Sequence, residues 1–357
     1  MAVDSGKTKM IPGDITPPPE RLAESIKTSC RLIKSGSPSV FKLPLEEEDI
    51  GIDGCKSYTF GQNSQRRRPN CTVMFLGETG SGKSTLINGM INYVLGIDWK
   101  DSFRFKLIDE DQSKSQTESQ TSHVTTYKVN HQDGFRVPYS LTIIDTPGFG
   151  DTRGIERDRA ITEQIRSLFT SAKEDREINA VCFVTQASLA RLTAAQESVF
   201  HSVLSLFGKN VAEKICILVT FADTQKPPVL EAITASNVPC PKTNKGLPVH
   251  HKFNSSALFA DNRSVGDPGE DPEKDMVRFN SVVWAMGAKS MEGFFTALDK
   301  MTRSEKGLLE AAVEGIQPQV QPQVQPQVEN RSTQQQMGKH NADNTPKAKP
   351  SKKCSIS

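Results

Sequence analysis

The fold is decided by Gly77-Glu78-Thr79-Gly80-Ser81-Gly82-Lys83-Ser84-Thr85. This stretch satisfies the pattern G-x-x-x-x-G-K-[ST] in full. The apolar segment 71–76 before it has the composition of a buried strand, and the segment 86–95 after it carries apolar residues at helical spacing. When a glycine-rich loop connects a strand to a helix, the backbone N–H groups of the loop and the N-terminus of the helix can bind an anion. The stretch therefore predicts a phosphate-binding loop.

The residues of this loop have separate expected roles. Lys83 is expected to reach the β- and γ-phosphates of a nucleotide, and the Ser84 hydroxyl to bind Mg²⁺. The other residues are expected to surround the phosphates: Glu78, Thr79, Gly80, Ser81, Gly82 and Thr85. A chance glycine-rich turn before a helix is the alternative, and the correct flanks on both sides argue against it.

A second candidate motif is Asp145-Thr146-Pro147-Gly148, which follows the β-rich segment 139–144. A carboxylate at the end of a strand that faces the phosphate loop can hold Mg²⁺ through water, which is the role expected of Asp145. Gly148 would supply a backbone N–H near a γ-phosphate. The tetrapeptide alone is an ordinary turn sequence, and its place about sixty residues after the phosphate loop gives it meaning.

Strands and helices alternate through the middle of the chain. The segments 180–184 and 215–220 are continuous apolar runs, typical of strands covered on both faces, and 155–169 and 193–207 have helical periodicity. A hairpin is expected from 125–129 and 139–144. The predicted fold class is α/β, a doubly wound, mostly parallel sheet with one antiparallel strand.

The strand 215–220 leads into Thr220-Phe221-Ala222-Asp223. The Asp223 carboxylate could accept hydrogen bonds from N1–H and the 2-amino group of guanine, whereas adenine offers neither donor. An aspartate that caps the following helix is an equally good interpretation. Both alternatives stay open at this point.

Composition limits the classes of partner. The chain has 357 residues and a formal net charge of +2, so no global field argues for nucleic acid. Its seven dispersed cysteines fit a reducing compartment. The first thirty residues lack the apolar stretch of a signal peptide, and no apolar run is long enough to span a membrane. Residue 2 is Ala, which excludes N-myristoylation. We expect a cytoplasmic protein.

Four segments are expected. Residues 1–69 should be mostly disordered, with a short helix within 21–32, and 70–300 should form the folded core. Residues 301–316 should be a short helical extension. Residues 317–357 contain three copies of Gln-Pro-Gln-Val followed by a basic tail, and proline at every fourth position favours an extended spacer.

The phosphate loop, the D-T-P-G motif, T-F-A-D and Asn254-Ser255-Ser256-Ala257 resemble, in this order, the motifs of guanine-nucleotide-binding G domains. The stretch 190–208 and the form D-T-P-G-F-G-D are similar to the immunity-associated (GIMAP) GTPases and their septin-like relatives. The resemblance covers about residues 70–300 and implies a P-loop G domain that binds GTP or GDP with Mg²⁺. It implies nucleotide contacts for Thr220, Asp223 and Asn254.

The resemblance also implies a threonine that ligates Mg²⁺ only in the GTP state. Thr117, Thr121 and Thr125 all precede the second strand of the hairpin, and Thr121 or Thr125 is favoured by distance to Asp145. Two residues depart from the family pattern. Phe221 stands where the guanine motif has lysine, which alters the contact with the base. Phe149 stands where Ras-like enzymes carry a water-orienting glutamine, so unaided hydrolysis should be slow.

The chain ends in Cys354-Ser355-Ile356-Ser357, a C-a-a-X pattern that predicts farnesylation of Cys354. Lysines 347, 349, 352 and 353 lie just upstream and could add on the order of 4 kcal/mol at an anionic membrane, about 1 kcal/mol for each charge. One lipid chain and a basic patch together suffice for reversible attachment. The alternative is a solvated tail with a chance cysteine.

Together these features predict a GTP-binding protein with weak GTPase activity. It would act as a nucleotide switch attached to the cytosolic face of a membrane, or as a nucleotide-dependent homodimer or oligomer that pairs through the G domain. A guanine-nucleotide-binding scaffold that does not hydrolyse GTP is the first alternative. A P-loop kinase is the second, and the D-T-P-G motif and the hairpin before it argue against that class.

Overall fold

The computed structural model describes residues 21–62, 68–109, 122–150, 154–170, 178–194, 209–263 and 272–303, and also 196–197, 200, 204 and 206–207. All of these lie in the first of the two units into which the chain divides, Met1–Gly315. The predictions for 304–357, including the Gln-Pro repeat, the basic tail and Cys354, fall outside the described residues.

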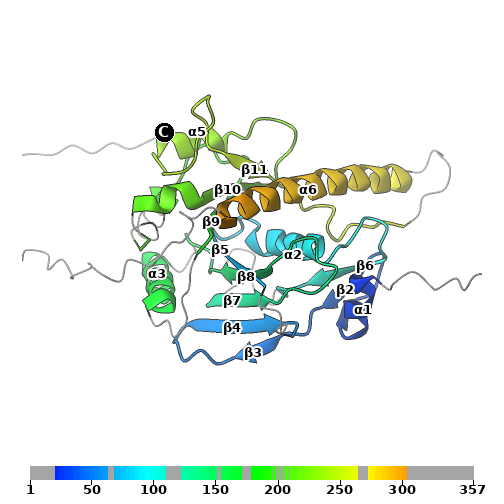
Figure 1. Ribbon diagram of the computed structural model, residues 1–357. Helices are drawn as coiled ribbons and strands as arrows, with labels where there is room; N and C mark the ends of the chain where they lie inside the picture. Colours follow the sequence, from blue (N-terminus) through cyan, green and yellow to red (C-terminus); the bar gives the residue numbers. More distant parts are fainter. Residues whose placement is uncertain are drawn as a thin grey trace, which may run out of the picture. The chain divides into compact units, whose positions relative to one another are not determined.

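An eight-stranded sheet runs through this unit in the order β11-β10-β9-β5-β8-β7-β4-β3 (Figure 1). Its strands are β3 (Glu46–Glu48), β4 (Cys55–Phe60), β5 (Asn70–Gly77), β7 (Val124–Val129), β8 (Ser140–Asp145), β9 (Ala180–Gln186), β10 (Ile215–Thr220) and β11 (His250–Lys252). The five strands from β11 to β8 are mutually parallel, and β7 is antiparallel to β8. The predicted doubly wound, mostly parallel α/β fold and its hairpin are confirmed.

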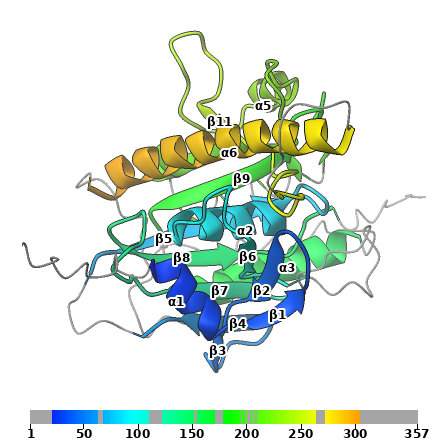
Figure 2. The same ribbon diagram turned by 90° about the vertical axis from the view of Figure 1, so that its right-hand side faces the viewer.

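Helices cover both faces of the sheet (Figure 2). One face packs against α1 (Leu22–Thr28), α2 (Lys83–Val94) and α6 (Pro272–Arg303). The other packs against α3 (Ile155–Thr170), α5 (Val229–Ala235) and the 3-10 helix Lys209–Lys214. Because both faces are covered, β5, β9 and β10 are buried almost throughout, which explains their unbroken apolar sequences.

The expectation that residues 1–69 are mostly disordered is wrong for 21–60. This segment forms α1, β1 (Arg31–Lys34) and β2 (Ser39–Lys42) as well as β3 and β4. Strand β4 runs parallel to β7, and β3 runs antiparallel to β4, so this segment extends the main sheet by two strands. The three residues of β3 are all glutamates and none is buried, and only Ser57 and Phe60 of β4 are buried. These strands therefore contain no apolar run from which they could be predicted.

Strands β1 and β2 form a second, three-stranded sheet with β6 (Phe103–Lys106), which lies in the segment inserted between α2 and β7. Two amide side chains of α2 form hydrogen bonds with the backbone groups along the free edge of β6 and of the residues just after it. Asn92 accepts the Phe105 N–H at 2.9 Å and donates to the Phe105 carbonyl at 2.7 Å. Asn88 accepts from Leu107 at 2.8 Å and donates to the carbonyl of Ile108 at 2.9 Å. The buried edge therefore keeps its hydrogen bonds without another strand.

Arg104, in the middle of β6, is fully buried. Its guanidinium donates to the carbonyls of Leu258 (3.1 Å), Asp101 (2.7 Å), Phe103 (2.8 Å) and Trp99 (3.1 Å). It also lies 4.3 Å from the centroid of the Trp284 ring on α6. Burial lowers the pKa of Arg104 to about 10, so the side chain stays charged at neutral pH. Arg104 therefore joins the inserted strand to α6 and to the loop after β11.

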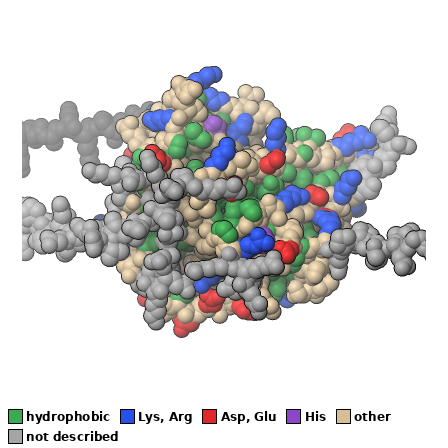
Figure 3. Space-filling model, in the orientation of Figure 1, with side chains coloured by type: hydrophobic (Ala, Val, Ile, Leu, Met, Phe, Trp, Pro, Cys, Tyr) green, Lys and Arg blue, Asp and Glu red, His purple; other side chains and the backbone are tan. Residues whose placement is uncertain are grey.

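Helix α6 (Pro272–Arg303) is the last element that the structure describes. Its buried face includes Met291, Phe294, Phe295 and Leu298. Near its start four large apolar side chains are exposed: Met276, Phe279, Val282 and Met286. Figure 3 shows hydrophobic side chains between basic ones on the face along this helix. Among the described residues, no helix is long and apolar enough to cross a membrane.

The Arg104 contacts yield a prediction on stability. Arg104→Leu should lower the free energy of unfolding by roughly 3 kcal/mol or more, because it leaves four carbonyls without their donor. Urea denaturation measures this change. Arg159→Leu is the control, since Arg159 forms only an exposed pair with Glu156 and its removal should change stability by less than about 1 kcal/mol. Equal losses in the two variants would contradict the assignment.

Candidate nucleotide-binding site

The phosphate loop connects β5 to α2, in the crevice where the sheet's connections turn to opposite sides. Two of its glycines have left-handed backbone angles, Gly80 at φ +78° and Gly82 at φ +84°. Gly82 caps α2, and the first intrahelical bond runs from the Leu86 N–H to its carbonyl. The N–H groups at the start of α2 have no earlier carbonyl to bind, so they are available to an anion.

Neighbouring strands brace this loop. A Cβ atom on Gly77 would lie 2.4 Å from the Val184 carbonyl oxygen of β9, so only glycine fits there. The buried Thr220 hydroxyl of β10 donates to the Ser81 carbonyl at 2.6 Å, and Gln186 of β9 donates to the Gly80 carbonyl at 3.0 Å. The resemblance implies a nucleotide contact for Thr220, whereas in the structure its hydroxyl faces two backbone carbonyls, that of Ser81 and, at 3.1 Å, that of Thr185.

The predicted phosphate and Mg²⁺ residues gather at this point. Lys83 is buried in the first turn of α2, with Nζ 3.3 Å from the Gly77 carbonyl oxygen, and Ser84 is the next residue. Asp145, the last residue of β8, is fully buried and stands between Phe75 of β5 and Thr125 of β7 in the strand register. The sheet therefore places Asp145 at the same edge as the loop.

Two buried hydroxyl groups test whether the loop fits a polar ligand. Thr79 Oγ1 and Ser81 Oγ have no hydrogen-bond partner among the residues that the structure describes. Unpartnered buried hydroxyls are rare in proteins, and phosphate oxygens at this loop would satisfy them. The part of the chain that the structure describes contains no group of three or more His, Cys, Asp or Glu side chains that could hold a metal ion by themselves. One carboxylate with one hydroxyl matches a Mg²⁺ ion that takes its other ligands from phosphates and water.

The D-T-P-G segment is joined directly to the phosphate loop. Phe149 donates its N–H to the Gly77 carbonyl at 3.2 Å and accepts the Thr79 N–H at 3.0 Å, which makes a parallel bridge. Gly148 packs so closely that an added Cβ would lie 2.4 Å from Thr79 Oγ1. Because the Phe149 side chain is buried in the core, it has no access to a water at the phosphates.

Glu78 lies at the edge of this cradle. Its carboxylate accepts a hydrogen bond from Gln196 Nε2 at 2.7 Å, and burial raises the pKa of the carboxyl. Thr193 and Gln196 form reciprocal hydrogen bonds, each between one side chain and the other backbone N–H, which makes Thr193 the N-cap of the helix that follows. The cap thereby connects the start of that helix to the phosphate loop, a contact that sequence spacing did not reveal.

The predicted base loop follows β10. Phe221 has an unusual positive φ of 51°, is 64% exposed, and its ring would lie 3.5 Å from a Cβ atom on Gly82. The exposed Asp223 carboxylate accepts the Gln225 N–H at 2.7 Å. The Ala222 N–H bonds to the Phe253 carbonyl at 3.1 Å, which brings the loop that contains Asn254 alongside.

The switch threonine remains a prediction. Thr117 and Thr121 lie outside the described residues. Thr125 is buried in β7, pairs with Asp145, and donates its hydroxyl to the His123 carbonyl at 3.2 Å. A strand residue paired in this way is poorly suited to approach Mg²⁺ in only one nucleotide state, and the role of Thr121 stays a prediction.

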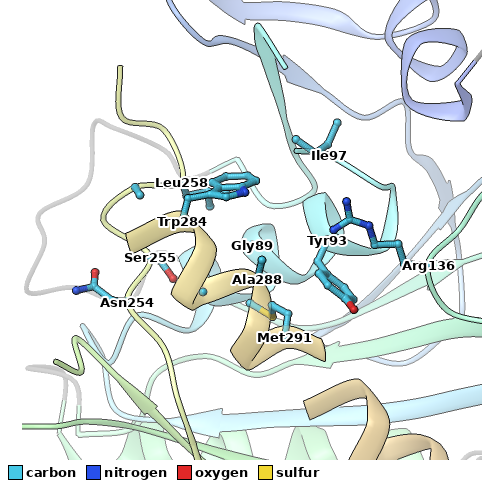
Figure 4. A pocket seen from close by; sticks show the side chains of 12 residues that line it. Gly89, Tyr93, Ile97, Arg136, Asn254, Ser255, Leu258, Trp284, Ala288 and Met291 are labelled. Atoms are coloured by element: carbon cyan, nitrogen blue, oxygen red, sulfur yellow. The ribbon is translucent and has the colours of Figure 1, made fainter. Parts of the chain in front are cut away.

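A small cavity of about 50 Å³ lies between α2, α6 and the loop after β11 (Figure 4). Its lining is mostly apolar and includes Tyr93, Trp284 and Met291, and the polar side chains of Arg136, Asn254 and Ser255 border it. The Asn254 side chain accepts the Ser256 N–H at 3.1 Å, which shapes the loop as a tight turn. The cavity is distinct from the phosphate loop.

The strand, glycine-rich loop, helix and strand-end aspartate define a P-loop G domain. Residues 71–240 match the model of the AIG1 family. The expected resemblance to immunity-associated and septin-like GTPases is thereby confirmed.

Two curated proteins are similar over part of the chain. Cell division control protein 3 of Candida albicans is 29% identical over 166 residues, which cover 45% of this chain and 38% of that protein. GTP-binding protein A of Dictyostelium discoideum is 27% identical over 157 residues, which cover 44% and 29%. The match spans less than two fifths of either relative.

Among solved structures, Toc33 from Arabidopsis thaliana in complex with GDP and Mg²⁺ is similar to this chain. It is 15% identical with a TM-score of 0.42, and the alignment covers 68% of this chain and 88% of that one.

The close packing of Gly148 yields a second prediction. Gly148→Ala should break the bridge between Phe149 and the phosphate loop, because its methyl group would overlap Thr79. Hydrogen exchange at the amides of Thr79 and Phe149 should accelerate at least tenfold, which corresponds to about 1.4 kcal/mol in the opening equilibrium. Gly287→Ala is the control, since its added Cβ would meet the Asn254 carbonyl oxygen at an ordinary 3.8 Å. Unchanged exchange in Gly148→Ala would contradict the account.

Proposed function

We propose that this protein is a guanine-nucleotide-binding switch that hydrolyses GTP slowly. One observation carries the proposal: Thr220, the residue that starts the base loop, donates its hydroxyl to Ser81 of the phosphate loop. This bond couples the two loops, so that a single nucleotide can meet the phosphate cradle and Asp223 together.

Different residues of the phosphate loop and of the neighbouring strand end would bind the phosphates and the metal ion. Backbone N–H groups at the start of α2 and the Lys83 ammonium would bind the phosphate oxygens. Ser84 and, through water, Asp145 would hold Mg²⁺, which neutralises charge that develops on the phosphates. The Phe149 bridge places Gly148 next to Thr79, where its backbone can respond to a γ-phosphate.

The base would meet an aromatic platform and a carboxylate. Phe221 is exposed beside Gly82, and a nucleobase that stacks on such a ring gains roughly 1–3 kcal/mol. Asp223 would accept the N1–H and the 2-amino group of guanine. Any nucleobase can stack on the Phe221 ring, so selectivity for guanine depends on Asp223.

Slow hydrolysis is supported by the burial of Phe149. The side chain after Gly148 can neither donate nor accept a hydrogen bond to an attacking water, a role that a glutamine performs in fast G proteins. A partner that pairs with the nucleotide face could supply the missing group. We extend the proposal to a homodimer through this face, for which the family resemblance is the support.

The tail extends the proposal to a membrane. The C-a-a-X sequence at Cys354 and the lysines before it support farnesylation and attachment to an anionic cytosolic surface. Mass spectrometry of protein from eukaryotic cells should show a farnesyl group on Cys354, and Cys354→Ser should shift the protein from the membrane to the soluble fraction. An unmodified Cys354 would remove this part of the proposal.

Base selectivity tests the proposal directly. Wild-type protein with Mg²⁺ should bind fluorescent GTP and GDP analogues at least tenfold more tightly than the ATP analogue. Asp223→Asn should lose about 1–3 kcal/mol of guanine affinity, since its amide offers an N–H where a carboxylate oxygen accepted one. It should gain affinity for xanthine nucleotides, whose 2-oxo group accepts that N–H. Equal binding of ATP and GTP by the wild type would contradict the proposal.

Single-turnover kinetics separates the switch from the non-hydrolysing scaffold that the buried Phe149 also allows. The wild type should convert bound GTP to GDP slowly, and Lys83→Ala should abolish conversion by removing the cation at the phosphates. Complete persistence of bound GTP in the wild type would establish the scaffold instead. The same assay at increasing protein concentration tests the dimer, because hydrolysis by a dimer rises with concentration.

A further inference from the structure

Lys252, the last residue of β11, reaches across to the base loop. Its register partner on β10 is Val219, the residue before Thr220. Its Nζ donates to the carbonyl oxygens of Asp223 at 3.0 Å, Gln225 at 3.2 Å and Thr224 at 3.3 Å. A lysine ammonium has three N–H donors, and all three go to successive carbonyls of one turn.

This arrangement fixes the backbone that carries the base-reading carboxylate. Asp223 is held by its own carbonyl, which bonds to Lys252, and by its carboxylate, which accepts the Gln225 N–H. Converging carbonyl dipoles repel one another, so the turn needs a cation at their focus. Without it, the turn would sample other conformations, and the Asp223 carboxylate would lose its fixed direction.

The need for such a brace follows from Phe221. The G-domain motif carries a lysine at this position, whereas here the side chain is aromatic and the backbone is left-handed. A non-glycine residue at positive φ is strained, so the strand-to-loop transition is not a favourable conformation by itself. Because stacking on Phe221 does not distinguish bases, recognition falls on the position of Asp223 alone.

We propose that Lys252 is the positioning residue for guanine selectivity in this chain. The inference rests on the proposed function, because it assumes that Asp223 reads the base. Lys252 touches no nucleotide in this account; it acts through the three carbonyls of the 223–225 turn. The positive charge on β11 thus supports a site whose motif lysine has been replaced.

Lys252→Met tests the inference, since methionine keeps the apolar stem and removes the donors. The bonds are solvent-exposed, so the thermal unfolding midpoint should hardly change. GDP affinity should fall roughly tenfold, as expected when a binding loop must be ordered on binding. ADP affinity should stay within twofold. The preference for GDP over IDP, which lacks the 2-amino group, should also shrink, because a displaced Asp223 loses its second hydrogen bond.

Lys226→Met is the matched control. Lys226 belongs to the same loop but pairs with Glu231 at 2.9 Å rather than with the turn, so GDP, IDP and ADP affinities should all stay within twofold of wild type. Lys252→Arg should restore part of the selectivity, since its charge remains but its planar fork cannot reach three converging carbonyls.

The outcomes separate the two proposals. A wild type that binds GDP and ADP equally would overturn the proposed function together with this inference. A wild type that prefers GDP, with the same GDP:ADP and GDP:IDP ratios in Lys252→Met, would overturn the inference alone. A parallel loss of GDP and ADP affinity in Lys252→Met would also overturn it, because that pattern reports damage to the whole site.

Discussion

The structure depends on the close approach of three strands around the phosphate loop. Gly77 touches β9 without room for a side chain, and Phe149 bonds to both sides of Glu78. Thr220 of β10 completes the bracing at Ser81. These contacts leave the loop conformation little freedom, so the amides at the start of α2 are preorganised before a phosphate arrives. Preorganised dipoles need no rearrangement on binding, which is the physical basis of the site.

The remainder of the domain supports this centre from outside. The segment 21–60 and the insertion with β6 pack against α2, whose amides Asn88 and Asn92 replace a neighbouring strand. Arg104 then links β6 to the carbonyl of Leu258 and to Trp284 of α6. The helix after the phosphate loop is therefore held by elements that carry no nucleotide motif.

Sequence predicted those parts of the site that backbone chemistry dictates. A glycine-rich loop between a buried strand and a helix has few alternatives, and an aspartate at a strand end must lie at the sheet edge. The sequence patterns did not predict contacts between side chains that are distant in the chain. Nothing in the spacing of Lys252 and Asp223 reveals their three hydrogen bonds, and charged short strands such as Glu46–Glu48 give no apolar signal. From sequence alone, Arg104 is expected at the surface. Its burial depends on carbonyl groups that other segments of the chain supply, and these contacts have no sequence signal.

If the phosphate loop and the base loop form one guanine-nucleotide site, a single nucleotide must protect both. Hydrogen exchange of the wild-type protein, alone and saturated with GDP and Mg²⁺ or ADP and Mg²⁺, measures this protection. The account predicts that GDP protects the amides of both 79–86 and 221–226, and that ADP at equal concentration protects the second segment less. Protection confined to 79–86 with identical profiles for both nucleotides, or no protection in either segment, would contradict the account.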